Sequence, residues 1–144
     1  MLNENLLRSK QLGTLERKGI KDIRAIQSFS HFETLKLNQN RIRSITPLKD
    51  MSSLKELYLQ NNVINSIEGL PQRAKLRILA LWNNDIKDID LLDQYKELEE
   101  LYLQNNQINS ISGLSELKKL RLLYLSDNSI QDLAPLKSLP KIEQ

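Results

Sequence analysis

The side chains that most often carry acid–base or nucleophilic chemistry are few in this 144-residue sequence. His31 is the only histidine and stands beside Phe32, where we expect a surface or capping role rather than general-base catalysis. Glu99 and Glu100 are adjacent, but neighbouring residues of a strand point to opposite sides, so they do not form a catalytic pair. The chain contains no cysteine, which excludes a thiolate nucleophile, a disulfide and a thiolate zinc site.

Four aspartates come closest to the pattern of a metal site: Asp85, Asp88, Asp90 and Asp93. They lack the glycine and the spacing of a calcium-binding loop, so we interpret them as a solvated face. Ser44, Ser66 and Ser110 recur at multiples of one interval, which indicates a structural role rather than nucleophiles. There is no glycine-rich phosphate loop. We therefore predict that the protein is not an enzyme and has no catalytic residue, no metal ligand and no cofactor.

The charge balance excludes further classes of partner. Lysine and arginine number 21 against 18 acidic residues, so charge alone favours neither direct nucleic-acid binding nor a membrane surface. No apolar run approaches the roughly 20 residues that span a bilayer. The N-terminal residues lack the features of a secretory signal, and no Asn-x-Ser/Thr sequon occurs. We expect an intracellular, cytoplasmic protein.

The elements that position these side chains follow from a repeat of 22 residues, which runs from Phe32 to Ile142 without slippage. Leucine at the fourth and sixth positions predicts a short strand with one buried face. Aliphatic residues at positions 11, 14 and 17 are expected to fill the core from the return segment. The ninth position is always an asparagine: Asn40, Asn62, Asn84, Asn106 and Asn128. Because an amide both donates and accepts, we predict a structural asparagine ladder along the turns.

Residues 54–64 and 98–108 read LKELYLQNNVI and LEELYLQNNQI. Both match the LxxLxLxxNxI pattern of the leucine-rich-repeat family, which the chain resembles over residues 32–142. The 22-residue period and the IxxIxxL pattern after the asparagine resemble the subclass typified by a regulatory subunit of protein phosphatase 1. The resemblance implies an α/β right-handed solenoid that forms an arc. A parallel sheet would line its concave face, and short 3₁₀ or irregular segments its convex face.

We predict a single domain over residues 1–144. Residues 32–141 form five repeats, and residues 142–144 begin an incomplete one. Residues 1–31 provide an N-terminal cap and a degenerate repeat, in which Gly13 replaces a strand leucine and Lys18 replaces the asparagine.

Two further predictions concern the ends. Apolar residues near the N-terminus are expected to form one side of a short leading helix: Leu2, Leu6 and Leu7. No amphipathic cap follows the fifth repeat, and an uncovered strand edge is prone to pairing. We therefore expect that the sequence is truncated here, or that a partner or a second copy of the chain covers this C-terminal edge, with self-association as one form of contact.

The third, fifth and seventh positions of each repeat point to the concave side. Four of the five tyrosine and tryptophan residues fall there, whereas the core is expected to be aliphatic. Exposed tyrosine and tryptophan are favoured anchors of protein interfaces. The predicted binding residues are Tyr58, Ile78, Trp82, Tyr102, Leu122 and Tyr124. Small Ala80 predicts a notch between Tyr58 and Tyr102. The alternative is a purely structural ladder of stacked rings.

These observations favour a protein-binding module, a regulatory or scaffold subunit, whose concave face recognises a protein partner. Two alternatives stay open at this stage. One is an RNA-associated scaffold subunit of a ribonucleoprotein, in which the repeats contact a partner protein rather than the RNA. The other is a structural or adhesion repeat module.

Overall fold

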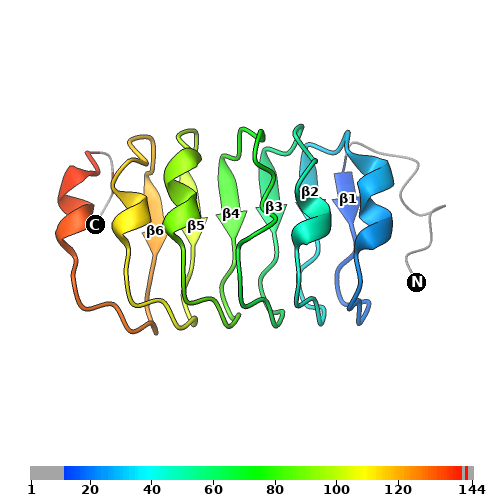
Figure 1. The fold of residues 1–144 in the computed structure, drawn as a ribbon, viewed down its shortest axis with the longest axis horizontal. Helices are drawn as coiled ribbons and strands as arrows, with labels where there is room; N and C mark the ends of the chain where they lie inside the picture. Colours follow the sequence, from blue (N-terminus) through cyan, green and yellow to red (C-terminus); the bar gives the residue numbers. More distant parts are fainter. Residues whose placement is uncertain (1–11, 141, 143–144) are drawn as a thin grey trace.

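The computed structural model describes residues 12–140 and residue 142. Within this part the chain forms one six-stranded parallel sheet, whose strands follow one another in sequence order (Figure 1). The strands are β1 (Leu12–Thr14), β2 (Thr34–Lys36), β3 (Glu56–Tyr58), β4 (Ile78–Ala80), β5 (Glu100–Tyr102) and β6 (Leu122–Tyr124). Neighbouring strands pair at an offset of 22 residues, as Leu35 with Leu57. The predicted parallel sheet and its register are confirmed.

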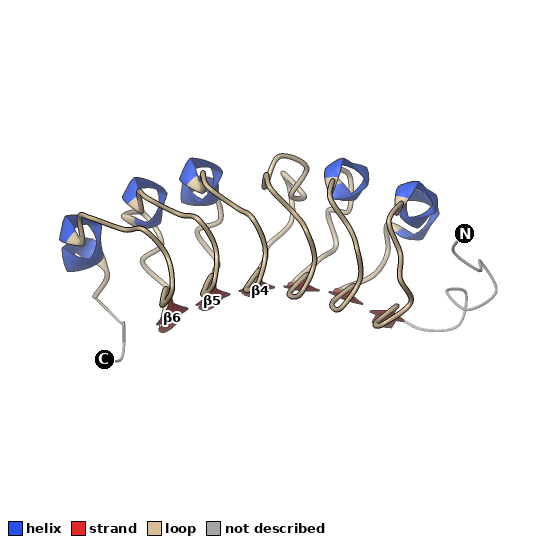
Figure 2. Ribbon diagram, turned by 90° about the horizontal axis from the view of Figure 1, so that it is seen from below, coloured by secondary structure: helices blue, strands red, loops and turns tan. Residues whose placement is uncertain are grey.

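Short 3₁₀ helices lie on the opposite side of each turn from the sheet, and the sheet lines the inner, concave side of an arc (Figure 2). In the described residues they are η1 (Arg24–Phe29), η2 (Thr46–Leu48), η3 (Asp90–Gln94), η4 (Ser112–Leu114) and η5 (Ala134–Ser138). This confirms the predicted arc with short convex segments. No helix in the described part of the chain is long and apolar enough to cross a membrane.

The turn that follows β3 is the exception on the convex side, since plain turns replace the 3₁₀ helix there. Gly69 in this turn has a φ of 104°, which lies outside the right-handed region that a 3₁₀ helix requires. Gly113 stands at the same repeat position within η4, so glycine permits the different convex conformation of this repeat without requiring it.

The core is a continuous column of side chains between the sheet and the convex segments. Each of β2, β3 and β5 alternates half-buried, buried, half-buried, so its central leucine points inward. Leu35, Leu57, Leu79 and Leu101 are 0% exposed. One expectation was wrong: the core is not purely aliphatic. Phe32 is 0% exposed, and Tyr95, on the return segment, is 3% exposed.

The degenerate first turn joins the same column. Gly13 pairs with Leu35, as the 22-residue register predicts. A Cβ on Gly13 would lie 2.9 Å from a methyl carbon of Leu35 and 3.0 Å from the Phe32 ring. The larger phenylalanine ring thus occupies space that a leucine would fill at this strand position. The predicted helix with Leu2, Leu6 and Leu7 lies outside the described residues.

Candidate functional site

The predicted asparagines lie where each strand turns away from the sheet, and each one joins two successive turns. The Nδ2 of Asn84 donates to the carbonyl of Leu81 in its own turn at 2.9 Å and to that of Leu59 in the preceding turn at 3.2 Å. Its Oδ1 accepts from the backbone N–H of Ile64 at 3.0 Å. The other four make equivalent bonds: Asn40, Asn62, Asn106 and Asn128. The amides therefore hold the strand ends at a fixed spacing.

The residue just before each asparagine is a structural position that the sequence analysis did not identify. It adopts a left-handed backbone, with φ between 54° and 58°: Gln39, Asn61, Asn83, Asn105 and Asp127. Asparagine and aspartate tolerate this conformation better than most residues, so their recurrence was the available signal. In this conformation the backbone N–H of Asn61 donates to the carbonyl of Trp82 at 3.0 Å, which extends the ladder beyond the strands.

The register brings the predicted concave residues together in rows across the sheet. Tyr58 pairs with Ala80, Ala80 with Tyr102, and Tyr102 with Tyr124. The rings of Tyr102 and Tyr124 stack with their centroids 5.3 Å apart. The Nζ of Lys36 lies 5.5 Å from the centroid of the Tyr58 ring, within the range of a cation–π contact. The concave face thus carries an aromatic row that is interrupted at Ala80.

Exposure differs among the predicted binding residues. Tyr124 is 49% exposed. The other five are half-buried: Tyr58, Ile78, Trp82, Tyr102 and Leu122. The predicted notch at Ala80 is wrong, because Ala80 is only 3% exposed and its neighbours cover it. At these positions the concave face therefore offers partly exposed side chains rather than a deep pocket.

Two carboxylates stand beside the tyrosines on the concave face. The Tyr58 hydroxyl donates to Glu56 at 3.3 Å, and the Tyr102 hydroxyl donates to Glu100 at 2.8 Å. Burial, together with the adjacent carboxylate, raises the pKa of both tyrosines to about 12. The phenols are thus neutral hydrogen-bond donors at physiological pH, and they orient the glutamates.

The charged residues at the second repeat position form ion pairs with their own neighbours. Lys55 pairs with Glu33 at 2.9 Å. Arg77 makes two bonds to Glu99, at 2.9 and 3.0 Å. The hydrogen bond from Arg77 holds the pKa of Glu99 below its usual value. The ammonium group of Lys55 and the guanidinium group of Arg77 are thus each paired with a carboxylate.

The side chains first considered for chemistry do not converge in the structure. In the described residues no group of three or more histidine, cysteine or acidic side chains is arranged to hold a metal ion. Asp90, from the aspartate run, accepts a hydrogen bond from the Ser112 hydroxyl at 2.8 Å. The exposed His31 ring lies 4.6 Å from the Phe32 ring, centroid to centroid.

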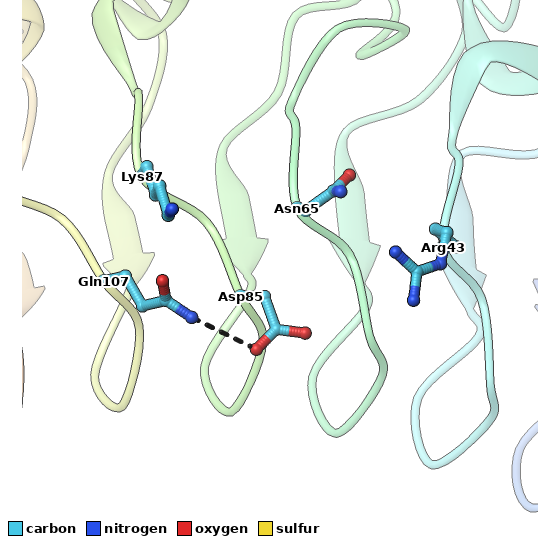
Figure 3. Close-up of a pocket in the computed structure, with 5 residues that line it drawn as sticks. All are labelled: Arg43, Asn65, Asp85, Lys87 and Gln107. Carbon is cyan, nitrogen blue, oxygen red and sulfur yellow. Dashed lines mark hydrogen bonds between the residues drawn. The ribbon is translucent and has the colours of Figure 1, made fainter.

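A shallow depression lies on the segments that run from the strand ends toward the convex side (Figure 3). Its lining residues are Arg43, Asn65, Asp85, Lys87 and Gln107. All five are exposed, and Gln107 donates to Asp85 at 3.4 Å. None of the predicted binding residues lines it.

A parallel sheet on the inner side of an arc, short convex segments and an asparagine ladder define a solenoid built from short repeats. The family pattern described as "Leucine Rich repeats (2 copies)" matches residues 32–72 and 74–116. The chain belongs to the leucine-rich-repeat family. A search of curated proteins found no match.

Solved structures of bacterial repeat proteins are similar in both fold and sequence. The internalin InlC2 of Listeria monocytogenes is 33% identical with a TM-score of 0.84, over 90% of this chain and 57% of that one. The internalin InlF of the same species is 32% identical with a TM-score of 0.79, over 86% of this chain and 37% of that one. A leucine-rich-repeat protein of Leptospira interrogans is 28% identical with a TM-score of 0.75, over 86% of this chain and 33% of that one. The chain thus spans about a third to just over half of these proteins.

Proposed function

We propose that this chain is a protein-binding module, a regulatory or scaffold subunit, and that its concave face recognises the partner. The observation that carries the proposal is the placement of the rings. Tyr58, Trp82, Tyr102 and Tyr124 occupy neighbouring concave positions, although the core accepts aromatic rings such as Phe32 elsewhere. Tyrosine and tryptophan combine a large contact area with a polar tip, which suits an interface.

A binding role accounts for the site better than catalysis does. The tyrosine hydroxyls on the concave face donate to the carboxylates of Glu56 and Glu100, and the strands hold these groups at a fixed spacing. A fixed array of this kind suits recognition of a surface. Function on a repeat scaffold depends on such variable surface positions rather than on the fold itself.

Comparative affinity purification tests the proposal. Bait proteins would be the wild type and the triple variant Tyr58→Ala/Trp82→Ala/Tyr102→Ala, with its folding checked by circular dichroism. We expect a partner that the wild type retains and the triple variant loses. A matched control is Arg43→Ala/Lys87→Ala in the depression of Figure 3, which should retain the partner. Retention by the triple variant and loss by the control would place the site on the flank and contradict the proposal.

Two finer points belong to the same proposal. The 22-residue register and the short 3₁₀ segments support membership of the subclass typified by the phosphatase regulatory subunit.

The cysteine-free sequence supports a site of action inside the cell, in the cytoplasm. Fractionation of cells that express the tagged full-length protein tests the location, and recovery in a non-cytoplasmic fraction would contradict it.

The last described turn supports a further contact, self-association with a second copy. Leu133 is 59% exposed, whereas its counterpart Ile111 in the preceding turn is 1% exposed. Leu123 and Leu125 of this turn are only partly buried. Sedimentation of the full-length protein over a range of concentrations should show a dimer that Leu133→Glu abolishes. A monomer at every concentration would contradict self-association and leave the concave-face proposal intact.

A further inference from the structure

The three central strands present a regular chemical alternation on the concave face. The outer two, β3 and β5, carry glutamate and tyrosine and are followed by glutamine, and β4 between them carries apolar residues and is followed by tryptophan. Along the direction of each strand the residues are Glu56, Tyr58 and Gln60 for β3, Ile78, Ala80 and Trp82 for β4, and Glu100, Tyr102 and Gln104 for β5. Since strands are spaced about 4.8 Å apart, the two glutamates are separated by roughly 10 Å across an apolar centre.

The charge on this central area is negative, although the whole chain is formally +3. Among the described residues, neither Glu56 nor Glu100 has a lysine, arginine or histidine nitrogen within ion-pair distance. The neighbouring cations Lys55 and Arg77 pair with the other acids, Glu33 and Glu99. Two carboxylates on this face therefore lack a cation of their own.

Hydrogen-bond acceptors are in surplus at the same place. The hydroxyls of Tyr58 and Thr34 donate to Glu56, and that of Tyr102 donates to Glu100, which leaves each carboxylate with further lone pairs. A ligand that brings hydrogen-bond donors and positive charge therefore complements these two carboxylates.

The aromatic rings provide a second attraction for a cation. Lys36 already places its Nζ 5.5 Å from the centre of the Tyr58 ring at one end of the row. Tryptophan is the strongest cation–π partner among the aromatic residues, and Trp82 is half-buried in the middle of the area. The rings and the carboxylates thus both favour a positively charged side chain from the partner.

We propose that the partner contributes an amphipathic helix that lies across β3, β4 and β5 and presents a basic, an apolar and a basic side chain on successive turns. Helix turns repeat about every 5.4 Å, which nearly matches the strand spacing of about 4.8 Å, so each turn meets one strand. Basic residues seven positions apart then reach Glu56 and Glu100. An apolar residue three or four positions after the first then lies over Ile78, which stands between the two glutamates in the register.

Extended partners match this alternation less well. In a β-strand, side chains on one face recur about every 6.7 Å, so three in a row span roughly 13 Å instead of 10 Å. In a polyproline helix, side chains on one face recur about every 9.3 Å, which reaches both glutamates but skips the apolar centre. The helix alone places one side chain on each of the three strands.

This inference rests on the proposed function, and direct titration with a defined peptide tests it. The probe is a helix-stabilised peptide with two arginines seven residues apart and two leucines between them on the same face. Trp82 is the only tryptophan in the chain, so its fluorescence reports binding to the full-length protein. We expect saturable binding that weakens as salt is raised, and weaker binding of a peptide with glutamates in place of the arginines.

The variant Glu56→Gln/Glu100→Gln keeps the size of both side chains and their bonds from the tyrosines, and removes both charges. We expect it to bind the basic peptide about tenfold more weakly than the wild type. The control Glu97→Gln/Glu116→Gln removes two charges that pair with Lys119 and Lys96 on the return segments. It should bind within about twofold of the wild type, and melting curves confirm that both variants are folded.

Equal binding of the basic and glutamate peptides, or full binding by Glu56→Gln/Glu100→Gln, would overturn the inference. The purification experiment separates this failure from that of the proposed function. A natural partner that the aromatic triple variant loses and Glu56→Gln/Glu100→Gln keeps would leave the concave site standing and refute the basic helix. A partner that both variants keep would contradict both proposals.

Discussion

At the scale of single residues, the asparagine of each repeat forms hydrogen bonds to two turns at once. Its amide donates to carbonyls of two turns and accepts a backbone N–H from the preceding one, as Asn84 does with Leu81, Leu59 and Ile64. No other side chain of similar size offers two donors and an acceptor in this geometry. The side chain therefore satisfies backbone groups that would otherwise be buried without partners.

The first prediction concerns the position of an asparagine along the array. Asn84 is 8% exposed and its bond to Ile64 is buried, whereas the bond from Ile108 to Asn128 is only partly buried. Asn84→Ala should therefore lower the free energy of unfolding by about 2–3 kcal/mol, and Asn128→Ala by about 1 kcal/mol, because water can reach the N–H released at the latter site. Urea unfolding of both variants measures the difference, and equal losses would contradict it.

The second prediction concerns alkaline pH. Burial raises the pKa of Tyr95 to about 12, and burial with a nearby glutamate does the same for Tyr58 and Tyr102. In the unfolded chain a tyrosine ionises near pH 10, so between about pH 10 and 12 the unfolded state loses protons first. The stability that these neutral phenols contribute is fully present below about pH 10 and is lost as the pH rises toward 12.

Melting temperatures measured from about pH 9 to 12 should show this loss, with tyrosinate absorbance followed in parallel. Tyr95→Phe removes one of the raised phenols without changing the ring, so its melting temperature should fall less steeply over the same range. An identical slope for Tyr95→Phe and the wild type would show that Tyr95 does not contribute to the alkaline loss.

Sequence analysis succeeded with residues whose role is set by their own chemical type. It failed with residues whose exposure is set by the side chains packed around them. The asparagine predicts its own bonds because only an amide can make them. Ala80 was interpreted as an open notch because it is small, but the larger side chains beside it cover the gap. Tyr95 was not assigned to the core because its position in the repeat varies in type, and only packing shows that this ring points inward.

At the scale of elements, the strands are only three residues long, and their register follows from the repeat rather than from strand propensity. A slip of one residue would move the central leucine of each strand to the concave face. The convex segments are less predictable, because the same repeat position gives a 3₁₀ helix at Thr46–Leu48 and plain turns around Gly69. Contacts between successive segments decide which conformation forms.

Gly69 shows that contact directly. A Cβ on this residue would lie 2.4 Å from the Cα of Thr46, a backbone atom of the preceding turn. Gly19 also has a left-handed backbone, with φ 64°, but nothing lies within 4 Å of the same added atom. The two glycines therefore separate the cost of backbone strain from the cost of a steric clash.

The third prediction compares these two positions. Gly19→Ala should lower the free energy of unfolding by about 1 kcal/mol, the cost of a left-handed alanine. Gly69→Ala should lower it by about 3 kcal/mol or more, because the clash forces two convex segments apart in addition. Chemical unfolding measures both. Similar losses in the two variants would contradict the close packing of the segments around Gly69 and Thr46.

At the scale of the whole molecule, burial is uneven along the array. The aliphatic residues of the turns around β3, β4 and β5 are almost completely buried, because each turn packs against one on either side. Residues of the last described turn are more exposed: Leu123, Leu125, Ile130, Leu133 and Leu136. In a repeat protein stability is approximately the sum of the repeats and of the contacts between neighbours. The turns therefore differ in local stability even though their sequences are alike.

The fourth prediction follows from that unevenness. In native-state hydrogen exchange, backbone amides that bond between the central strands should exchange most slowly, including that of Leu81, which donates to the Tyr102 carbonyl at 2.8 Å. The amide of Leu136, which bonds to Leu133 within the last described turn, should exchange much faster, because opening this turn exposes little buried apolar surface.

Leu79→Ala, at a fully buried position, should lower the free energy of unfolding by about 2–5 kcal/mol and speed exchange in the central turns. Leu133→Ala should cost less than about 1 kcal/mol. Uniform exchange rates along the chain would indicate that the array unfolds only as one unit. In that case the strands of the proposed basic-helix site would be no more rigid than the rest of the concave face.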